Sequence, residues 1–300
     1  MNLSEILITM EVTQDNRFDI APETKLWRYM SFAKFAALLH DKELVLSPLH
    51  LFEDPYEGAG GKACYMEKLA DAMIDTFGQM EQTKNAVEKL EAMNIDVNKQ
   101  KEVMRLWMKV GNEYGQVNRM FTFVNCWHEN EDESEAMWKL YTAHQPEGVA
   151  IQTTYEALRQ AINEPEVKIG RITYENFDHA FMPGDSYGWY KRKSFEHERE
   201  VRVMAEPDEE QRRDMAKGYD KGNQYTVLLP VDLDVLIKNV YVSPYAQSWF
   251  KELVEAEMKW SGLEKPVVYS KMNDQALFFF SRKQLHQMCE SAMRNKSEKQ

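Results

Sequence analysis

The chain has 300 residues, 43% of them hydrophobic, which is enough to bury a substantial core as one large domain or two smaller ones. Its formal net charge of -12, from 37 basic and 49 acidic residues, argues against a dedicated nucleic-acid surface. Three widely spaced cysteines fit neither a disulfide framework nor a zinc spacing, and no apolar run is as long as the roughly 18 residues of a membrane span. We therefore expect a cytoplasmic protein that does not bind membranes.

The first sixty residues predict a strand, a helix and a second strand. Residues 25–30 form the first strand, and Ser31 is a suitable N-cap for a helix over 32–40, where Phe and Leu recur at helical spacing. The second strand covers residues 43–46. Ser47-Pro48 ends this strand, and a loop rich in proline, glycine and acidic residues follows.

Residues 62–118 differ from the rest of the chain in composition. They are rich in Glu, Lys, Met, Ala and Leu and contain no proline, which is typical of helices. We expect two or three helices here, as an insertion within a single α+β domain that spans residues 1–300.

Beyond the insertion, short strands alternate with helices until a polar tail closes the chain. The expected strands cover residues 121–127, 148–153, 167–174, 192–204, 225–230, 237–243 and 266–270. The expected helices cover residues 134–142, 155–162 and 246–258. The fold class is therefore α+β, with mixed, mostly antiparallel sheets of short strands, flanking helices and the helical insertion.

The segment from Lys193 to Val203 has an unusual charge pattern. If it is a strand, its period of two places Glu196, Glu198, Glu200 and Arg202 on one face, where like charges about 7 Å apart repel. One interpretation is a solvated edge strand protected by its charge. The other is a pair of carboxylates, Glu198 and Glu200, that perform acid/base chemistry or bind a ribose.

Other residues would complete a nucleotide pocket around these carboxylates. Such a pocket uses cations, aromatic stacking surfaces and polar groups from loops. The candidates are Arg28, Tyr29, Ser47, Asp54, Trp138, Tyr141 and Arg202. There is no P-loop or Gly-x-Gly-x-x-Gly motif, and Cys126-Trp127-His128 is more typical of a strand end than of a metal site.

These residues carry a resemblance to the bacterial domain-of-unknown-function family 2971, whose members often occur near phage-resistance genes. The resembling blocks are 26–29 with 47–48, 52–57, 137–141 with 148–149, and Phe195-x-x-Glu198-x-Glu200-x-Arg202. Glu53 stands where the family usually has Asn, and Phe195 where it usually has Trp.

The order of these blocks is also similar to that of ADP-ribosyltransferase cores. This resemblance implies NAD as the substrate and a macromolecule as the acceptor. Arg28 would then bind the NAD ribose or phosphate, and Tyr29 or Tyr141 would stack on the nicotinamide. Glu200 would hold the ribose 2′-hydroxyl, and Glu198 would orient or deprotonate the acceptor.

Three hypotheses about function remain open. The first is an NAD-dependent ADP-ribosyltransferase acting as a phage-defence or toxin effector. The second is a non-catalytic binding or sensing module of a defence system, with a protein partner on the helical insertion. The third is a metal-dependent phosphodiesterase that uses Asp54, Glu198 and Glu200 to hold Mg²⁺. The first requires Arg28 and the late carboxylates to line a shared pocket.

Overall fold

The computed structural model describes residues 16–60, 117–142, 146–178, 184–219, 222, 224–273 and 281–297. The predicted helical insertion over 62–118 lies outside the described residues apart from its last two positions, and so it stays a prediction.

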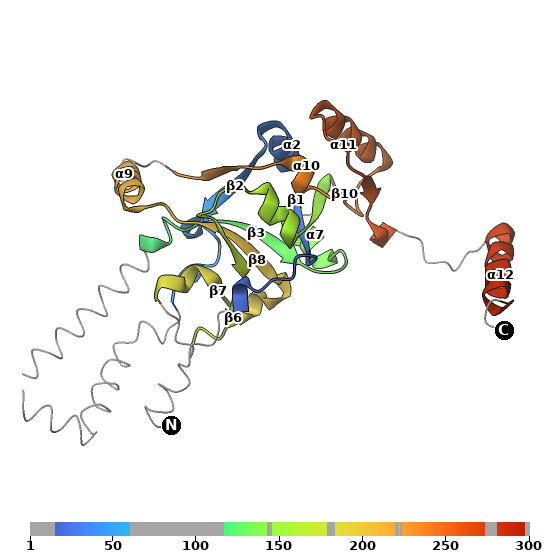
Figure 1. Ribbon diagram of the computed structural model, residues 1–300, viewed down its shortest axis with the longest axis horizontal. Helices are drawn as coiled ribbons and strands as arrows, with labels where there is room; N and C mark the ends of the chain where they lie inside the picture. Colours follow the sequence, from blue (N-terminus) through green and yellow to red (C-terminus); the bar gives the residue numbers. More distant parts are fainter. Residues whose placement is uncertain are drawn as a thin grey trace, which may run out of the picture.

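In the described part of the chain, nine strands form one sheet and two more form a small separate pair (Figure 1). The sheet order is β11-β10-β4-β1-β3-β2-β9, and β8 and β5 extend from the second edge of β3. The sheet strands are β1 (Lys25–Ser31), β2 (Glu43–Pro48), β3 (Phe123–Glu129), β4 (Gly148–Thr154), β5 (Lys168–Arg171), β8 (Glu200–Ala205), β9 (Val227–Pro230), β10 (Asn239–Val242) and β11 (Val267–Tyr269). Only β10 and β11 run parallel within it. The separate pair, β6 (Thr173–Glu175) and β7 (Tyr190–Arg192), is also parallel.

Helices cover both faces of the sheet because the side chains of its strands alternate between two apolar clusters. Leu26 and Met30 belong to the main core with side chains of α2, α8, α10 and α11, whereas Trp27 and Tyr29 pack against α7. The α-helices are α2 (Phe32–Asp41), α7 (Glu135–Tyr141), α8 (Tyr155–Ala161), α9 (Glu209–Tyr219), α10 (Leu233–Leu236), α11 (Ser248–Trp260) and α12 (Arg282–Ser297). The 3₁₀-helices are η1 (Asn16–Phe18), η2 (Leu49–Leu51), η3 (Gly184–Trp189), η4 (Lys193–Glu198) and η5 (Lys271–Asn273). No helix in the described segments is long and apolar enough to cross a membrane.

The predicted fold class is confirmed, since the sheet is mixed, mostly antiparallel and flanked by helices. Most predicted elements occur within two or three residues of their expected bounds, and Ser134 caps α7 by accepting a hydrogen bond from the Met137 amide. Two predictions along the chain were wrong. The expected strand over 167–174 is divided into β5 and β6, and the polar tail contains the helix α12.

The predicted strand over 192–204 was also wrong in its first half. Residues Lys193–Glu198 form the helix η4, Arg199 has a left-handed φ of 41°, and β8 begins only at Glu200. A period of two therefore does not relate Glu196 to Glu198. The solvated-edge interpretation was wrong as well, because β8 lies between β3 and β5 and Arg202 is 0% exposed.

A split in the sheet at β3 determines where the site lies. Along one edge, β3 pairs with β8 from Phe123 to His128. Along the other edge, β1 pairs with its end at His128 and Glu129, and β2 pairs with its start at Phe123 and Val124. The middle of β3 therefore has no ladder partner on this side, and β1 and β2 diverge from it.

Candidate functional site

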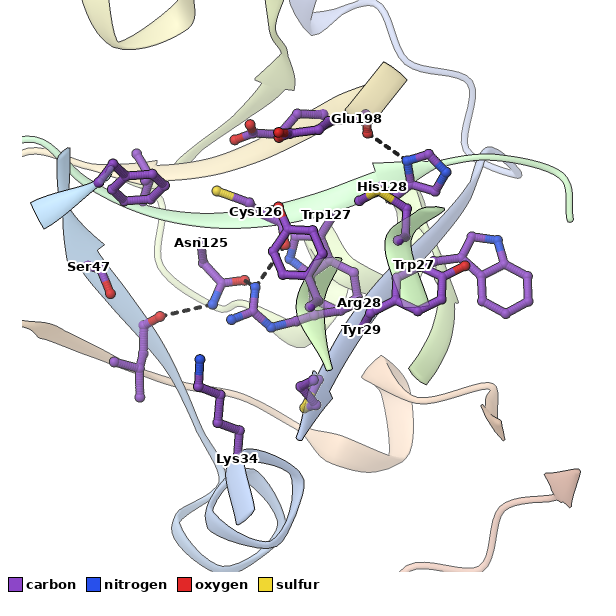
Figure 2. A pocket seen from close by; sticks show the side chains of 17 residues that line it. Trp27, Arg28, Tyr29, Lys34, Ser47, Asn125, Cys126, Trp127, His128 and Glu198 are labelled. Atoms are coloured by element: carbon purple, nitrogen blue, oxygen red, sulfur yellow. Dashed lines mark hydrogen bonds between the residues drawn. The ribbon is translucent and has the colours of Figure 1, made fainter. Parts of the chain in front are cut away.

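A pocket opens over this split and has a volume of about 150 Å³ (Figure 2). Its walls come from β1, α2, β2, β3, α7, the end of η4 and the start of β8. The structure brings six of the nine predicted site residues to this pocket: Arg28, Tyr29, Ser47, Tyr141, Glu198 and Glu200. Arg28 of the first strand, Glu198 at the end of η4 and Glu200 at the start of β8 therefore share one hollow.

Arg28 replaces the missing ladder bonds in the middle of β3. Its Nη1 donates to Asn125 Oδ1 at 2.7 Å and to the Cys126 carbonyl oxygen at 2.8 Å. Asn125 in turn donates from Nδ2 to the Val45 carbonyl oxygen at 2.9 Å. Two side chains thus link β1, β3 and β2 where the backbone strands separate (Figure 2).

Replacing Asn125 by alanine is expected to lower the free energy of unfolding by about 1–3 kcal/mol, because it removes one of the two acceptors of Arg28 and leaves the Val45 carbonyl oxygen without its donor at a partly buried position. Urea denaturation of the full chain measures this loss. Asn239→Ala is the matched control, since Asn239 bonds Gln152 in a fully paired part of the sheet. A loss no larger than that of the control would contradict the linking role of Asn125.

The charge of Arg28 is not neutralised by a carboxylate in the described residues. Its hydrogen-bond acceptors are an amide oxygen and a carbonyl oxygen, and its guanidinium lies 5.9 Å from the centroid of the Trp127 ring. Burial lowers the pKa of Arg28 from its usual value, although a guanidinium remains charged at neutral pH. A half-buried cation with only neutral partners at a pocket wall favours an anionic ligand.

Lys34 adds a second cation to the same pocket. It is exposed, lies on α2 and points toward the space between Ser47 and Arg28 (Figure 2). Among the described residues, no carboxylate forms an ion pair with Lys34. Two unpaired positive charges and the Ser47 hydroxyl therefore face one hollow, a donor set that suits phosphate oxygens.

The carboxylates belong to a buried network at the opposite wall. Lys191 Nζ lies 2.6 Å from Glu198 Oε2, 2.9 Å from Glu57 Oε1 and 3.2 Å from Glu200 Oε2. Arg202 Nε donates to Glu200 Oε1 at 2.6 Å, and its Nη2 donates to Glu57 Oε2 at 3.1 Å. Three carboxylates thus surround two cations, which leaves one negative charge in excess.

The surroundings of Glu198 and Glu200, the two carboxylates that line the pocket, shift their pKa values in opposite directions. Burial raises the pKa of Glu198, and the nearby Lys191 ammonium only partly offsets this. Burial acts in the same direction on Glu200, but the attraction of Arg202 and Lys191 outweighs it and lowers the pKa of Glu200 to about 2. Glu200 is therefore fixed as an anion, while Glu198 is the carboxylate suited to exchange a proton.

Cys126 connects the two walls. Its carbonyl oxygen accepts from Arg28, and its thiol interacts electrostatically with the Glu200 carboxylate. Burial raises the pKa of this thiol well above its usual range, so it is not a nucleophile at neutral pH. The cation of β1 and the carboxylate of β8 are thus separated by one residue of β3.

His128 also lines the pocket and completes the support of Glu198. Its Nδ1 lies 2.6 Å from the Glu198 carbonyl oxygen, and burial lowers the pKa of the ring. The neutral tautomer with the proton on Nδ1 satisfies this contact. Its Nε2 is buried and has no hydrogen-bond partner among the residues that the structure describes.

Three predicted site residues lie outside the pocket. Trp138 is buried against Tyr29 and donates from Nε1 to Glu133. Arg202 is completely buried behind Glu200, where it neutralises carboxylates. Asp54 forms an ion pair with Arg192, with Arg192 Nη2 at 2.8 Å from Oδ1.

Tyr29 lines the pocket, but its hydroxyl already accepts a hydrogen bond from the Ser134 amide at 2.9 Å. It therefore holds the start of α7 in place. Burial raises the pKa values of both Tyr29 and Tyr141, so both phenols stay neutral.

The fold brings to the site several residues that the sequence did not predict. Lys34 belongs to the polar face of a helix, and Asn125 and Lys191 have no local motif. Glu57 lies in the acidic loop over 52–57. Its ion pairs with the buried Lys191 and Arg202 join residues that are far apart in the sequence, so only the tertiary structure reveals them. His128 carried a signal, since a polar residue in a strand of apolar neighbours is a candidate for a site.

The carboxylates named for a metal-dependent phosphodiesterase do not form a group. Asp54 pairs with Arg192, and Glu198 and Glu200 pair with Lys191 and Arg202. The described segments contain no cluster of three or more His, Cys, Asp or Glu side chains that could hold a metal ion.

Comparison with protein-family models, with curated proteins and with solved structures found no match for this chain. The family resemblance of the sequence blocks therefore stays a prediction.

Proposed function

We propose that the protein binds NAD in this pocket, cleaves the bond between nicotinamide and ribose, and transfers ADP-ribose to a macromolecule. The observation that carries the proposal is the shared pocket of Arg28, Glu198 and Glu200. The resemblance to ADP-ribosyltransferase cores assigns the same residues to NAD. A role in phage defence or as a toxin effector rests on that resemblance alone.

In the proposed reaction, the C1′–N1 bond of the nicotinamide riboside breaks and its electron pair leaves with nicotinamide. The ribose then carries an oxocarbenium-like positive charge, which the fixed anion of Glu200 stabilises. An acceptor nucleophile forms the new bond to C1′ and loses its proton to Glu198. Glu198 suits this role because its raised pKa makes it a stronger base than an ordinary carboxylate.

Glu200 can accept a ribose hydroxyl without losing its protein partners. Each of its carboxylate oxygens already accepts from one cation, Oε1 from Arg202 and Oε2 from Lys191. A carboxylate has about four acceptor positions, so a hydrogen bond from the 2′-hydroxyl can be added. These cations also hold the carboxylate in one orientation, which preorganises the site.

A second candidate function, nucleotide binding without catalysis, is favoured by the same network. Lys191 and Arg202 partly neutralise the carboxylates, and this reduces the charge that can act on a ribose. In that case the pocket would bind NAD and leave it intact.

Incubation with NAD labelled in both the nicotinamide and the adenine separates these functions. We expect wild type to release labelled nicotinamide and to attach the adenine label to protein or nucleic acid, and Glu200→Gln to lose both. Glu196→Gln is the matched control, because Glu196 is exposed on η4 outside the pocket. NAD that is bound but recovered intact would support the binding module. Transfer that is unchanged in a folded Glu200→Gln variant would overturn the catalytic proposal.

A further inference from the structure

A second pocket of about 260 Å³ adjoins the first one on the side away from Glu198. It lies between α2 and the antiparallel pair of strands β2 and β9. The two pockets share six lining residues: Arg28, Met30, Lys34, Val45, Ser47 and Asn125. They are therefore two compartments of one groove, and the unpaired cations Arg28 and Lys34 lie at their junction.

The wall of the second compartment includes an exposed apolar surface. Val45 and Leu228 are directly opposite each other on β2 and β9, and they are 47% and 54% exposed. Ala37 lines the same compartment from the exposed side of α2. An exposed apolar surface of this kind can pack against the face of a purine base, and the bound base would then cover it from water.

The far end of the compartment carries hydrogen-bond acceptors. Asp41 and Glu43 line it, and neither forms an ion pair with lysine or arginine among the described residues. Asp41 lies 3.2 Å from His40, which is exposed beside it. Free carboxylate oxygens accept hydrogen bonds from ribose hydroxyls and from an exocyclic amine such as that of adenine.

We propose that this second compartment binds the adenosine end of a dinucleotide. The pyrophosphate then lies at the junction of Arg28 and Lys34, and the other nucleoside lies beside Glu198 and Glu200. This order rests on the proposed function only in placing the nicotinamide end next to the carboxylates. The base recognition by Val45 and Leu228 and the phosphate recognition by Lys34 are independent of any reaction.

Titration calorimetry of the full chain with AMP, nicotinamide mononucleotide and ADP-ribose tests the assignment. We expect Leu228→Asp to weaken AMP and ADP-ribose binding at least tenfold and to leave nicotinamide mononucleotide unchanged. Lys34→Ala is expected to weaken all three, because each carries a phosphate. Leu253→Asp, on the exposed side of α11, is the matched control for an added surface charge. Ala37→Glu provides a second, independent change in the same compartment.

The outcomes separate this inference from the proposed function. Absence of AMP binding by wild type would overturn the inference, and so would equal AMP affinity in wild type, Leu228→Asp and Ala37→Glu. Selective loss of AMP binding together with NAD that is never cleaved would uphold the adenosine compartment and overturn the proposed transfer reaction. Loss of nicotinamide mononucleotide binding in Leu228→Asp, with AMP unchanged, would reverse the order of the two ends and overturn the proposal.

Discussion

Replacing Arg202 by methionine is expected to lower the free energy of unfolding by about 3–5 kcal/mol. Arg202 is 0% exposed and donates to Glu200, to Glu57 and to the Gly188 carbonyl oxygen. Methionine fills much of the space but leaves all three carboxylates of the network with Lys191 as their only cation. This loss is a large part of the 5–15 kcal/mol typical of a folded domain. Chemical denaturation monitored by circular dichroism measures it.

Two further variants make the Arg202 result specific. Adding Glu57→Leu to Arg202→Met removes one of the stranded carboxylates and is expected to recover part of the lost stability. Lys139→Met breaks an exposed ion pair with Glu135 on α7 and is expected to cause no measurable change. Equal stability of wild type and Arg202→Met would show that the network does not support the fold.

Acid should also weaken the native network. The folded pKa of Glu200, about 2, lies below its ordinary value of 4.5. Glu200 therefore contributes stability above pH 4.5, and this contribution is lost as the pH falls from there toward 2.

Glu198→Gln is expected to lower the rate constant of ADP-ribose transfer to the acceptor by about 10²–10⁴ and to leave the free energy of unfolding equal or higher. The catalytic loss follows from removing the proton acceptor. The free energy of unfolding is expected to stay equal or to rise because the variant has two carboxylates beside Lys191 and Arg202 instead of three, which balances the charge of the network. Single-turnover kinetics with labelled NAD, together with urea denaturation, measure both quantities.

The pH profile provides a further readout for Glu198. Because its pKa is raised, the wild-type rate should increase as the pH rises through a value above 4.5, where Glu198 loses its proton. This increase should be absent from Glu198→Gln and present in Glu196→Gln, whose changed residue is exposed. A Glu198→Gln variant with the wild-type rate and pH profile would rule out Glu198 as the proton acceptor.

Local patterns in the sequence were sufficient to predict most elements. The strands β1 and β4 were predicted close to their observed bounds, and the helical spacing of apolar residues after Ser31 predicted α2. The segment before β8 could not be predicted this way, because alternation of charged residues is also compatible with a 3₁₀ turn. In the structure, Lys191 forms ion pairs with both Glu198 and Glu200. Arg199, which lies between the two glutamates, has a left-handed backbone conformation that turns both carboxylates toward this lysine.

The candidate site was predicted in part. Arg28, Glu198 and Glu200 were identified from their residue types and order, and they line one pocket. Arg202 and Trp138 were identified for the same reasons but are buried in supporting positions. Residue type alone does not separate a cation that lines a pocket from a cation that neutralises buried carboxylates. Arg28 and Arg202 differ only in which neighbours the fold supplies.

The sequence by itself determined the α+β class and the residue types that a nucleotide pocket needs, because strand and helix periods and charge are local properties of the chain. The tertiary structure decided where those residues act. One edge of β3 pairs with β1 at its end and with β2 at its start, so the sheet is open beside the middle of β3. Side chains that are separated by about 170 residues in the sequence line the pocket at this opening. Such meetings depend on strand pairing over long distances, which no local pattern encodes.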